Sequence, residues 1–150
     1  MESNDARLVI AGVVLLRNDG AALLQLRDNK PGLSAAGQWV FPGGHCECGE
    51  TIPDCARREF REETSYDCPD LKLLTSFPYR SPDTGAVFQL NFFWSQYDER
   101  QAIHCYEGQE IRFLQRNTIA ALPMPDYVPG VSDWAIQTFQ LDQKKTLRLR

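Results

Sequence analysis

The sequence contains no apolar run long enough to cross a bilayer. The longest near the N-terminus, residues 8–16, is interrupted by a glycine and falls short of the roughly 20 residues that a membrane-spanning helix needs. Residues 1–7 include acidic side chains and no basic cluster of the kind that begins a secretory signal. We therefore expect no membrane association and a cytoplasmic location.

An excess of positive charge is also lacking. Lys and Arg number 16 against 20 Asp and Glu, and the net charge at neutral pH is −4. An extended nucleic-acid surface needs a basic face that neutralises phosphates, so this class of partner is not expected. A small phosphorylated ligand bound through cations is compatible with the charge, and a homodimer is left open.

The cysteines do not follow the pattern of a disulfide framework. There are five, an odd number, at irregular spacings, which favours reduced thiols. His45, Cys46 and Cys48 could be read as part of a zinc site, but the usual C-x2-C spacing and a second pair of ligands are missing. The favoured interpretation is a short strand with Cys46 and Cys48 on one face and Glu47 on the other.

Internal repeats, low-complexity segments and interdomain linkers are absent, so residues 1–150 suit one domain. Apolar, β-rich runs predict strands near residues 8–16, 21–27, 39–41, 71–77, 87–97 and 111–114. A short helix is predicted at 117–122, and an amphipathic helix at 131–141 with Trp134 and Leu141 among its apolar positions. The basic tail, residues 142–150, is expected to fray or to add an edge strand. The mixture indicates an α+β fold.

Residues 43–66 carry most of the functional information. The stretch begins with Gly43-Gly44, which we expect to form a turn, and leads into a helix. That helix should begin near Ile52, with Thr51 as its N-cap. One face of it is apolar and consists of Ile52, Cys55, Ala56 and Phe60.

Three carboxylates share another face of this helix, because Glu59, Glu62 and Glu63 are spaced i, i+3 and i+4. Like charges at such spacings destabilise a helix by roughly a few tenths of a kcal/mol per pair, so the arrangement requires compensation. A bound hard cation such as Mg²⁺ or Mn²⁺ would provide it. The alternative is a solvated acidic face paired with the arginines of the same helix, Arg57, Arg58 and Arg61.

The spacing of these residues resembles the signature box of the Nudix hydrolases, G-x5-E-x7-R-E-U-x-E-E-x-G-U, where U is apolar. Gly44, Glu50 and the run at 58–63 match its fixed positions. Ser65 stands where the family has a glycine, and Tyr66 stands where an aliphatic residue is usual. The family's glycine ends the helix in a left-handed conformation, which serine adopts at a cost of roughly 1 kcal/mol.

The resemblance implies a Nudix fold, in which a mixed sheet is sandwiched between helices in α/β/α layers. It also implies a hydrolase that depends on Mg²⁺, with Mn²⁺ as a substitute. The metal ligands it implies are the carbonyl of Gly43 and the carboxylates of Glu59, Glu62 and Glu63.

The resemblance further assigns roles to residues in and after the box. Arg58 would orient the glutamates, and Glu50 would help to fix the loop and the helix. Glu59 is the first choice for the group that takes the proton of the attacking water. Glu110 is the second choice, and Glu107 is the other carboxylate in the region where the family often places an additional ligand or base.

The substrate is indicated by weaker features outside the box. Asp126 lies in a Pro-rich loop, at a place similar to the Asn or Asp that reads the base edge in members acting on oxidised nucleoside triphosphates; a turn residue is the alternative. Arg27 either points toward the ligand or is a solvated strand end. We expect hydrolysis of a nucleoside diphosphate linked to X. The first choice is a nucleoside triphosphate, intact or oxidised, that yields the monophosphate and pyrophosphate.

ADP-ribose or another nucleotide sugar is the main alternative substrate. Pro82 falls sixteen residues after the box, where ADP-ribose hydrolases of the family tend to carry proline, although Ser81-Pro82-Asp83 is also an ordinary turn. A Nudix-fold binding module without turnover is less expected. Such proteins commonly lose box carboxylates, and here all are retained.

Overall fold

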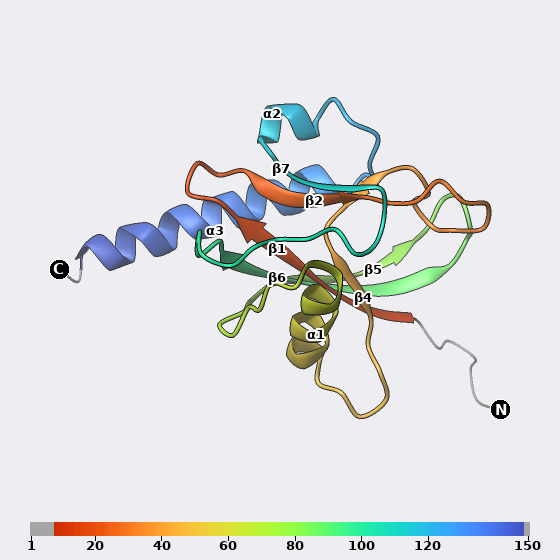
Figure 1. Cartoon of the computed structure of the whole chain (residues 1–150), viewed down its shortest axis with the longest axis horizontal. Helices are drawn as coiled ribbons and strands as arrows, with labels where there is room; N and C mark the ends of the chain where they lie inside the picture. Colours follow the sequence, from red (N-terminus) through yellow and green to blue (C-terminus); the bar gives the residue numbers. More distant parts are fainter. Residues whose placement is uncertain (1–7, 149–150) are drawn as a thin grey trace.

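The structure, a computed structural model, describes residues 8–148. In this range the chain forms, in order, β1 (Leu8–Leu16), β2 (Ala22–Leu26), β3 (Trp39–Val40), β4 (Gly43–His45), α1 (Ile52–Thr64), β5 (Lys72–Arg80), β6 (Val87–Gln96), β7 (Glu110–Leu114), α2 (Arg116–Ile119) and α3 (Val128–Arg148) (Figure 1). Every strand predicted from an apolar run is present, with its ends shifted by a few residues. The largest shift is at β5, which continues beyond the predicted end at residue 77 to Arg80.

The strands of the described range form one mixed sheet. β3, β2, β1, β6 and β5 follow one another across it, β4 pairs with β1, and β7 pairs with β2. β1 and β6 are parallel, from Leu8 opposite Phe88 to Leu16 opposite Gln96, whereas the other pairs are antiparallel. β1 is bonded to three other strands, which explains why its second half is fully buried.

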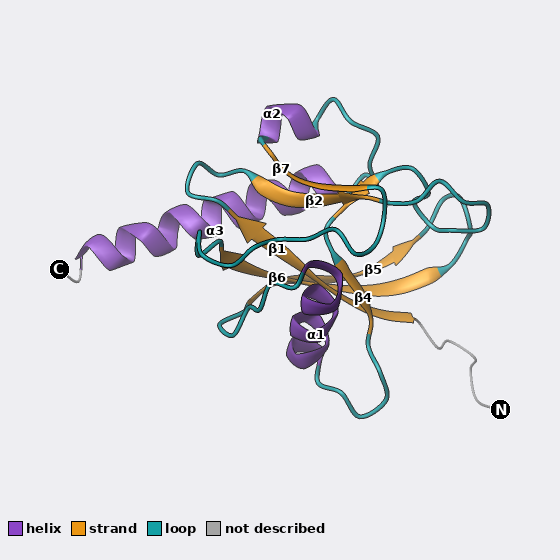
Figure 2. Ribbon diagram, in the orientation of Figure 1, coloured by secondary structure: helices purple, strands orange, loops and turns teal. Residues whose placement is uncertain are grey.

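Alternation along β1 builds a core on each face of the sheet. Val14 and Leu16 pack in the core that α3 covers, whereas Val13 and Leu15 pack in the core that α1 covers. Figure 2 shows the two helices on opposite sides of the sheet. The predicted α+β class and the α/β/α layers are therefore confirmed.

α1 begins where the sequence predicts, because Thr51 Oγ1 accepts a hydrogen bond from the Asp54 N–H at 3.2 Å. The apolar face of the helix is fully buried at Cys55, Ala56 and Phe60. The prediction is wrong for Ile52, which is 37% exposed. The whole first turn lies at the surface, so Ile52 has the correct helical phase but no layer to pack against.

α3 is longer than predicted, and two of the residues expected on its buried face are exposed. Residues 142–148 are helical rather than frayed, because Leu, Gln, Lys and Arg favour helix and basic side chains suit a helix C-terminus; residues 149–150 lie outside the described range. Trp134 and Leu141 were expected on the apolar face but are 55% and 60% exposed. The buried stripe consists of Val128, Val131, Ser132, Ala135 and Phe139, so burial agrees with the prediction at Phe139 but not at Trp134 or Leu141. No helix in the described range has the length and apolar character of a membrane span.

The glycine pair lies in a strand rather than in a turn. β4 pairs antiparallel with β1, where Gly43 is opposite Gly12. The strand ends at His45, so the strand predicted around Cys46 and Cys48 does not form. The Cys46 N–H still donates to the Val9 carbonyl of β1 at 2.9 Å, but after it the chain reverses toward α1.

Candidate active site

The guanidinium of Arg58 is the centre of the site. It donates hydrogen bonds to both oxygens of Glu50, from Nε at 2.6 Å and from Nη2 at 2.9 Å. Nη1 donates to Glu59 Oε1 at 3.0 Å and to Glu62 Oε2 at 3.2 Å, and Nη2 also reaches the His45 carbonyl at 3.1 Å. Charge-assisted bonds of this kind restrict the orientation of the carboxylates. The Arg58 hydrogen bonds also lower the pKa of Glu50 to about 2.

The two glycines allow β4 to pass directly against neighbouring groups. A Cβ at Gly44 would lie 2.2 Å from Glu59 Oε2, and a Cβ at Gly43 would lie 2.4 Å from the Ala11 carbonyl oxygen. The Gly43 N–H also donates to Glu63 Oε2 at 3.0 Å. β4 and α1 therefore meet at the carboxylates, and only glycine fits both positions without displacement.

Glu63 is a buried carboxyl group among other carboxylates, with an exposed fraction of 5%. Burial, a hydrogen bond with Glu107 and the charges of Glu107 and Glu59 raise the pKa of Glu63 to about 9. Burial also raises the pKa of Glu59. Carboxyl groups crowded in this way cannot all ionise unless a cation compensates them.

The donor atoms at this site suit a hard divalent cation, because they are carboxylate and backbone oxygens. In the part of the chain that the structure describes, however, no three carboxylate, thiol or imidazole groups converge as they do around a metal ion. Arg58 holds Glu59 and Glu62, and the Gly43 N–H holds Glu63. The donor set fits Mg²⁺ or Mn²⁺ once these side chains turn away from their present partners.

The loop before β7 brings Glu107 to the carboxylates. Sequence spacing left the choice between Glu107 and Glu110 open. The Tyr106 N–H donates to the Glu63 carbonyl at 3.0 Å, which places Glu107 beside Glu63, and the charge of Glu107 helps to raise the pKa of Glu63. Glu110 instead lies in β7 and forms an ion pair with Arg112. No sequence signal selects Glu107, because its place depends on how the loop that follows β6 crosses the end of α1.

A second group of residues surrounds Tyr127. The ring of Tyr79 meets it edge to face, with centroids 4.9 Å apart. Burial raises the pKa of Tyr127; the charge of Asp126 raises it further and that of Arg27 lowers it. The two residues predicted to bind substrate therefore lie near the same tyrosine. Sequence patterns do not identify Tyr79 and Tyr127, because an aromatic side chain in a strand or a Pro-rich loop is more often part of the core.

A pocket of about 360 Å³ lies between the loop at 28–38 and the turn that joins β5 to β6. The loop and the turn are connected by the Ala35 N–H, which donates to Asp83 Oδ2 at 3.1 Å, and by the hydroxyls of Ser34 and Thr84, 2.9 Å apart. Residues of both segments line the pocket. The loop therefore has a defined position over the neighbouring turn.

Comparison with known proteins decides the family. The family model described as NUDIX domain matches residues 6–134. The chain belongs to the Nudix hydrolase family. The uncharacterized Nudix hydrolase YvcI of Bacillus subtilis (strain 168) is 32% identical to this Nudix domain over 119 residues, which are 77% of this chain and 70% of that protein.

Two other relatives of the Nudix domain carry names that state a substrate. The nucleoside triphosphatase NudI of Escherichia fergusonii is 49% identical over 49 residues, 33% of this chain and 34% of that protein. The ADP-ribose pyrophosphatase of Methanocaldococcus jannaschii is 39% identical over 69 residues, 46% of this chain and 38% of that protein. The matches thus span well under two thirds of these relatives, and 18% of a Caenorhabditis elegans nudix hydrolase.

Solved structures share the fold. The MutT protein of Methanosarcina mazei Go1 has a TM-score of 0.74 and 18% identity, over 95% of this chain and 99% of that chain. The Nudix domain of NrtR from Shewanella oneidensis, solved with ADP ribose, has a TM-score of 0.73 and 20% identity, over 90% of each chain. At such identities the likeness concerns the fold alone.

Ser65 stands where the resemblance to the box predicts a glycine. This residue has φ 66° and ψ −1°, the left-handed conformation that a glycine would adopt at lower cost. Its N–H donates to the Arg61 carbonyl at 2.8 Å and closes the helix. The serine therefore preserves the helix end that the family's glycine normally forms.

Proposed function

We propose that this Nudix domain hydrolyses a phosphoric anhydride bond in a nucleoside diphosphate linked to another group, X. The observation that carries the proposal is the contact of the Gly43-Gly44 strand with the half-buried carboxylate of Glu59 and the buried carboxyl of Glu63. This contact brings backbone groups and negatively charged carboxylates together. Such a site can bind a divalent cation, which in turn binds the diphosphate of the substrate. The retention of every box carboxylate supports turnover rather than binding alone.

Mg²⁺ or Mn²⁺ would be held by the Gly43 carbonyl and by the carboxylates of Glu59, Glu62 and Glu63. When bound, the cation would neutralise the diphosphate and supply an activated water. Glu62 has a side chain that is 59% exposed, so it can turn toward a ligand at little cost in packing.

Arg58 positions the glutamates in this proposal. Its two bonds to Glu50 anchor the guanidinium at the start of α1, and its remaining N–H groups direct Glu59 and Glu62. Because two of its N–H groups are already bonded to Glu50, the Arg58 side chain loses less conformational entropy when its other N–H groups orient a carboxylate. The pair formed by Glu50 and Arg58 thus supports the site without touching the substrate.

Glu59 is our first choice for the group that takes the proton of the attacking water. Burial raises its pKa, which makes it a better base near neutral pH. Glu107 replaces Glu110 as the second choice, because Glu107 reaches Glu63 and Glu110 is paired with Arg112.

A nucleoside triphosphate, intact or oxidised, is our first choice of substrate, with the monophosphate and pyrophosphate as products. Asp126 is exposed beside Tyr127, so a carboxylate that can bond a base edge stands next to an aromatic ring. Arg27 adds a positive charge near the same tyrosine. The name of the relative NudI, a nucleoside triphosphatase, supports this class.

ADP-ribose or another nucleotide sugar is the second candidate. The pocket beside the turn that contains Pro82 has a volume of about 360 Å³, within the range of small-ligand sites, and offers room for a second sugar. A relative is named as an ADP-ribose pyrophosphatase, and one structural neighbour was solved with ADP ribose.

A substrate panel tests the proposal. The protein is incubated with Mg²⁺ and nucleoside triphosphates, oxidised triphosphates, ADP-ribose, dinucleoside polyphosphates or capped RNA, and products are identified by mass spectrometry. We expect turnover of at least one nucleotide, and a loss of roughly a hundredfold or more in Glu62→Gln and Glu63→Gln. Glu99→Gln, at an exposed residue outside the site, is the control.

Two outcomes contradict the proposal. No turnover of any member of the panel removes the enzyme assignment, and full activity of Glu63→Gln removes the buried carboxylate from the site. A thermal shift with Mg²⁺ gives a separate readout, because a ligand that binds only the folded state raises the melting midpoint. The shift should disappear in Glu63→Gln and return to the starting value when EDTA is added.

A further inference from the structure

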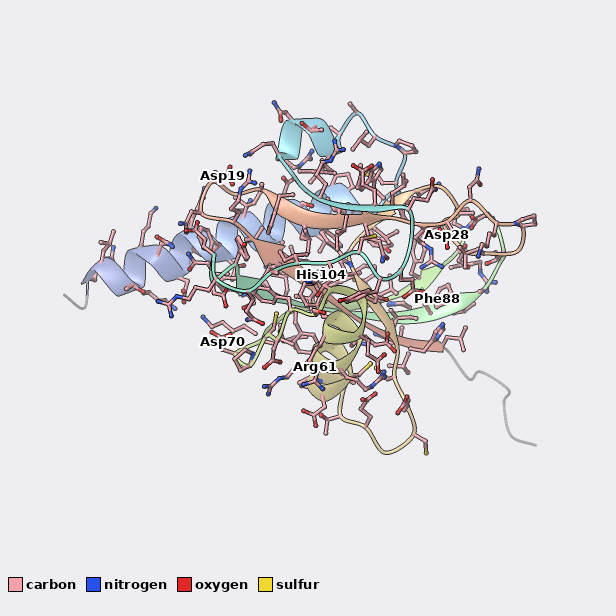
Figure 3. All side chains as sticks on the ribbon, in the orientation of Figure 1. Asp19, Asp28, Arg61, Asp70, Phe88 and His104 are labelled. Carbon is pink, nitrogen blue, oxygen red and sulfur yellow. The ribbon has the colours of Figure 1, made fainter. Side chains whose placement is uncertain are left out.

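The C-terminal end of α1 is covered by the segment 103–107. The His104 N–H donates to the Thr64 carbonyl at 2.8 Å, and the Tyr106 N–H donates to the Glu63 carbonyl at 3.0 Å. The last carbonyls of a helix have no partner within the helix, so these two bonds satisfy groups that water would otherwise solvate. Figure 3 shows His104 next to this end of α1.

Ser65 adds a side-chain contact that the family's glycine could not make. Its hydroxyl donates to the Tyr106 phenol oxygen at 3.2 Å. The Tyr106 ring stacks on the His104 ring, with centroids 5.4 Å apart, and is itself 63% exposed. Tyr106 therefore contributes little to the core, and its contacts concern the end of α1 and the adjacent loop.

The other end of this loop is attached to β2. The Glu107 carbonyl accepts a hydrogen bond from Gln25 Nε2 at 2.7 Å, and the Gln109 N–H donates to the Leu26 carbonyl at 2.8 Å. Gly108 lies so close to β2 that a Cβ would be 2.6 Å from the Leu26 carbonyl oxygen. The loop is thus held on both sides of Glu107, which follows directly after Tyr106, the residue whose N–H is bonded to the Glu63 carbonyl.

We propose that Ser65 and Tyr106 form a positioning pair that holds Glu107 against Glu63 at the end of the carboxylate helix. The main-chain bond of Tyr106 fixes the residue next to Glu107, and its phenol bond to Ser65 fixes the direction of the loop. This pair offers a reason for a serine in the left-handed conformation. A glycine would adopt that conformation at lower cost, but only the serine has a hydroxyl that bonds to the loop. The inference rests on the proposed function, in which Glu63 belongs to the reacting site.

The test compares Ser65→Gly, Ser65→Ala, Tyr106→Phe and the double variant Ser65→Ala/Tyr106→Phe with the whole wild-type chain. Each single change should lower kcat about fivefold to tenfold, the effect expected from one lost hydrogen bond that acts on the transition state, with KM changed less than twofold. The double variant should be no worse than the singles, because both remove the same bond. Tyr97→Phe, at a tyrosine whose ring packs on Tyr66 and Phe113, should leave kcat unchanged.

Ser65→Gly separates positioning from stability. Glycine relieves the left-handed backbone, so a purely structural serine predicts an unchanged or higher melting midpoint with unchanged kcat. A positioning serine predicts a lower kcat despite the relieved strain. Hydrogen exchange gives a readout that needs no substrate: the amides of residues 104–107 should exchange at least about threefold faster in Ser65→Gly and Tyr106→Phe than in the wild type.

The outcomes for the two proposals are distinct. If the wild type turns over a nucleotide while the variants keep both kcat and amide exchange, the positioning pair is wrong and the proposed function stands. If the wild type turns over nothing in the panel, the proposed function fails, and the exchange rates of residues 104–107 decide alone whether the pair holds the loop.

Discussion

The guanidinium of Arg58 donates two hydrogen bonds to the carboxylate of Glu50, at 2.6 Å and 2.9 Å. Glu50 precedes the first turn of α1, and Arg58 follows it on the helix, so the pair connects the loop to the helix that carries the other carboxylates. Glu50 Oε1 also accepts a bond from the Glu47 N–H at 3.1 Å. The loop that reverses the chain after β4 is therefore tied to α1 by an ion pair, in addition to the packing of Cys46 against the core that α1 covers.

Glu50→Gln should lower stability in a pH-dependent manner. The pKa of Glu50 is about 2 in the folded state, below its ordinary value of 4.5, so its contribution is fully present above pH 4.5 and is lost as the pH falls toward 2. Urea unfolding at pH 7, 4, 3 and 2 should therefore show a deficit for the variant that shrinks as the pH falls. A deficit that is equal at all pH values would contradict the assigned pKa. Arg58→Lys, which keeps the charge but not the bidentate geometry, should also be less stable at pH 7.

Glu63→Gln should raise the stability of the metal-free protein at alkaline pH. The pKa of Glu63 is raised to about 9, so its stabilising contribution is full below pH 4.5 and is lost as the pH rises toward 9, when the unfolded state ionises first. The amide introduced by Glu63→Gln does not ionise, so the variant does not lose stability as the pH rises. In EDTA, the melting midpoint of the variant should exceed that of the wild type by at least about 2 °C at pH 8, and the gain should vanish at pH 4. Glu62→Gln, at an exposed carboxylate, is the control and should show no such pH-dependent gain.

Gly43→Ala and Gly44→Ala should have different effects, although the two glycines are adjacent. The Cβ of Gly43→Ala meets the backbone of Ala11, which cannot move alone, so we expect a loss of about 1–3 kcal/mol in the free energy of unfolding. The Cβ of Gly44→Ala meets the end of the Glu59 side chain, which can turn away. That variant should keep its melting midpoint within about 2 °C while its turnover falls at least about tenfold. Equal stability losses in both variants would contradict the contacts described above.

Asp126→Ala should change the preference among bases more than the overall rate. Asp126 is exposed beside Tyr127 and far in sequence from the box, so its loss should remove a base contact without disturbing the carboxylates. The ratio of kcat/KM between purine and pyrimidine triphosphates, or between intact and oxidised ones, is the measurement. Asp142→Ala, at an exposed residue of α3 paired with Lys72, is the matched control. An unchanged base profile would leave Asp126 as a turn residue.

Local sequence rules predicted α1 well. The N-cap at Thr51, the buried residues Cys55 and Phe60 and the shared face of the carboxylates all follow from a period of 3.6 residues and from end effects within one turn. The same rules were wrong where the neighbouring layer decides. Ile52 and Trp134 have helical phases that suit burial, yet both are exposed, because no other element covers them.

The sequence by itself determined the family, the order of the strands and helices along the chain apart from β4, and the spacing that sets Glu59, Glu62 and Glu63 on one helix face. These depend on interactions over a few residues, which a pattern records directly. Only the tertiary structure decided that the loop residue next to Glu107 bonds to Glu63 and that the hydroxyl of Ser65 meets Tyr106. Both contacts join segments some forty residues apart, whose approach is set by how the sheet and α1 pack rather than by any local preference.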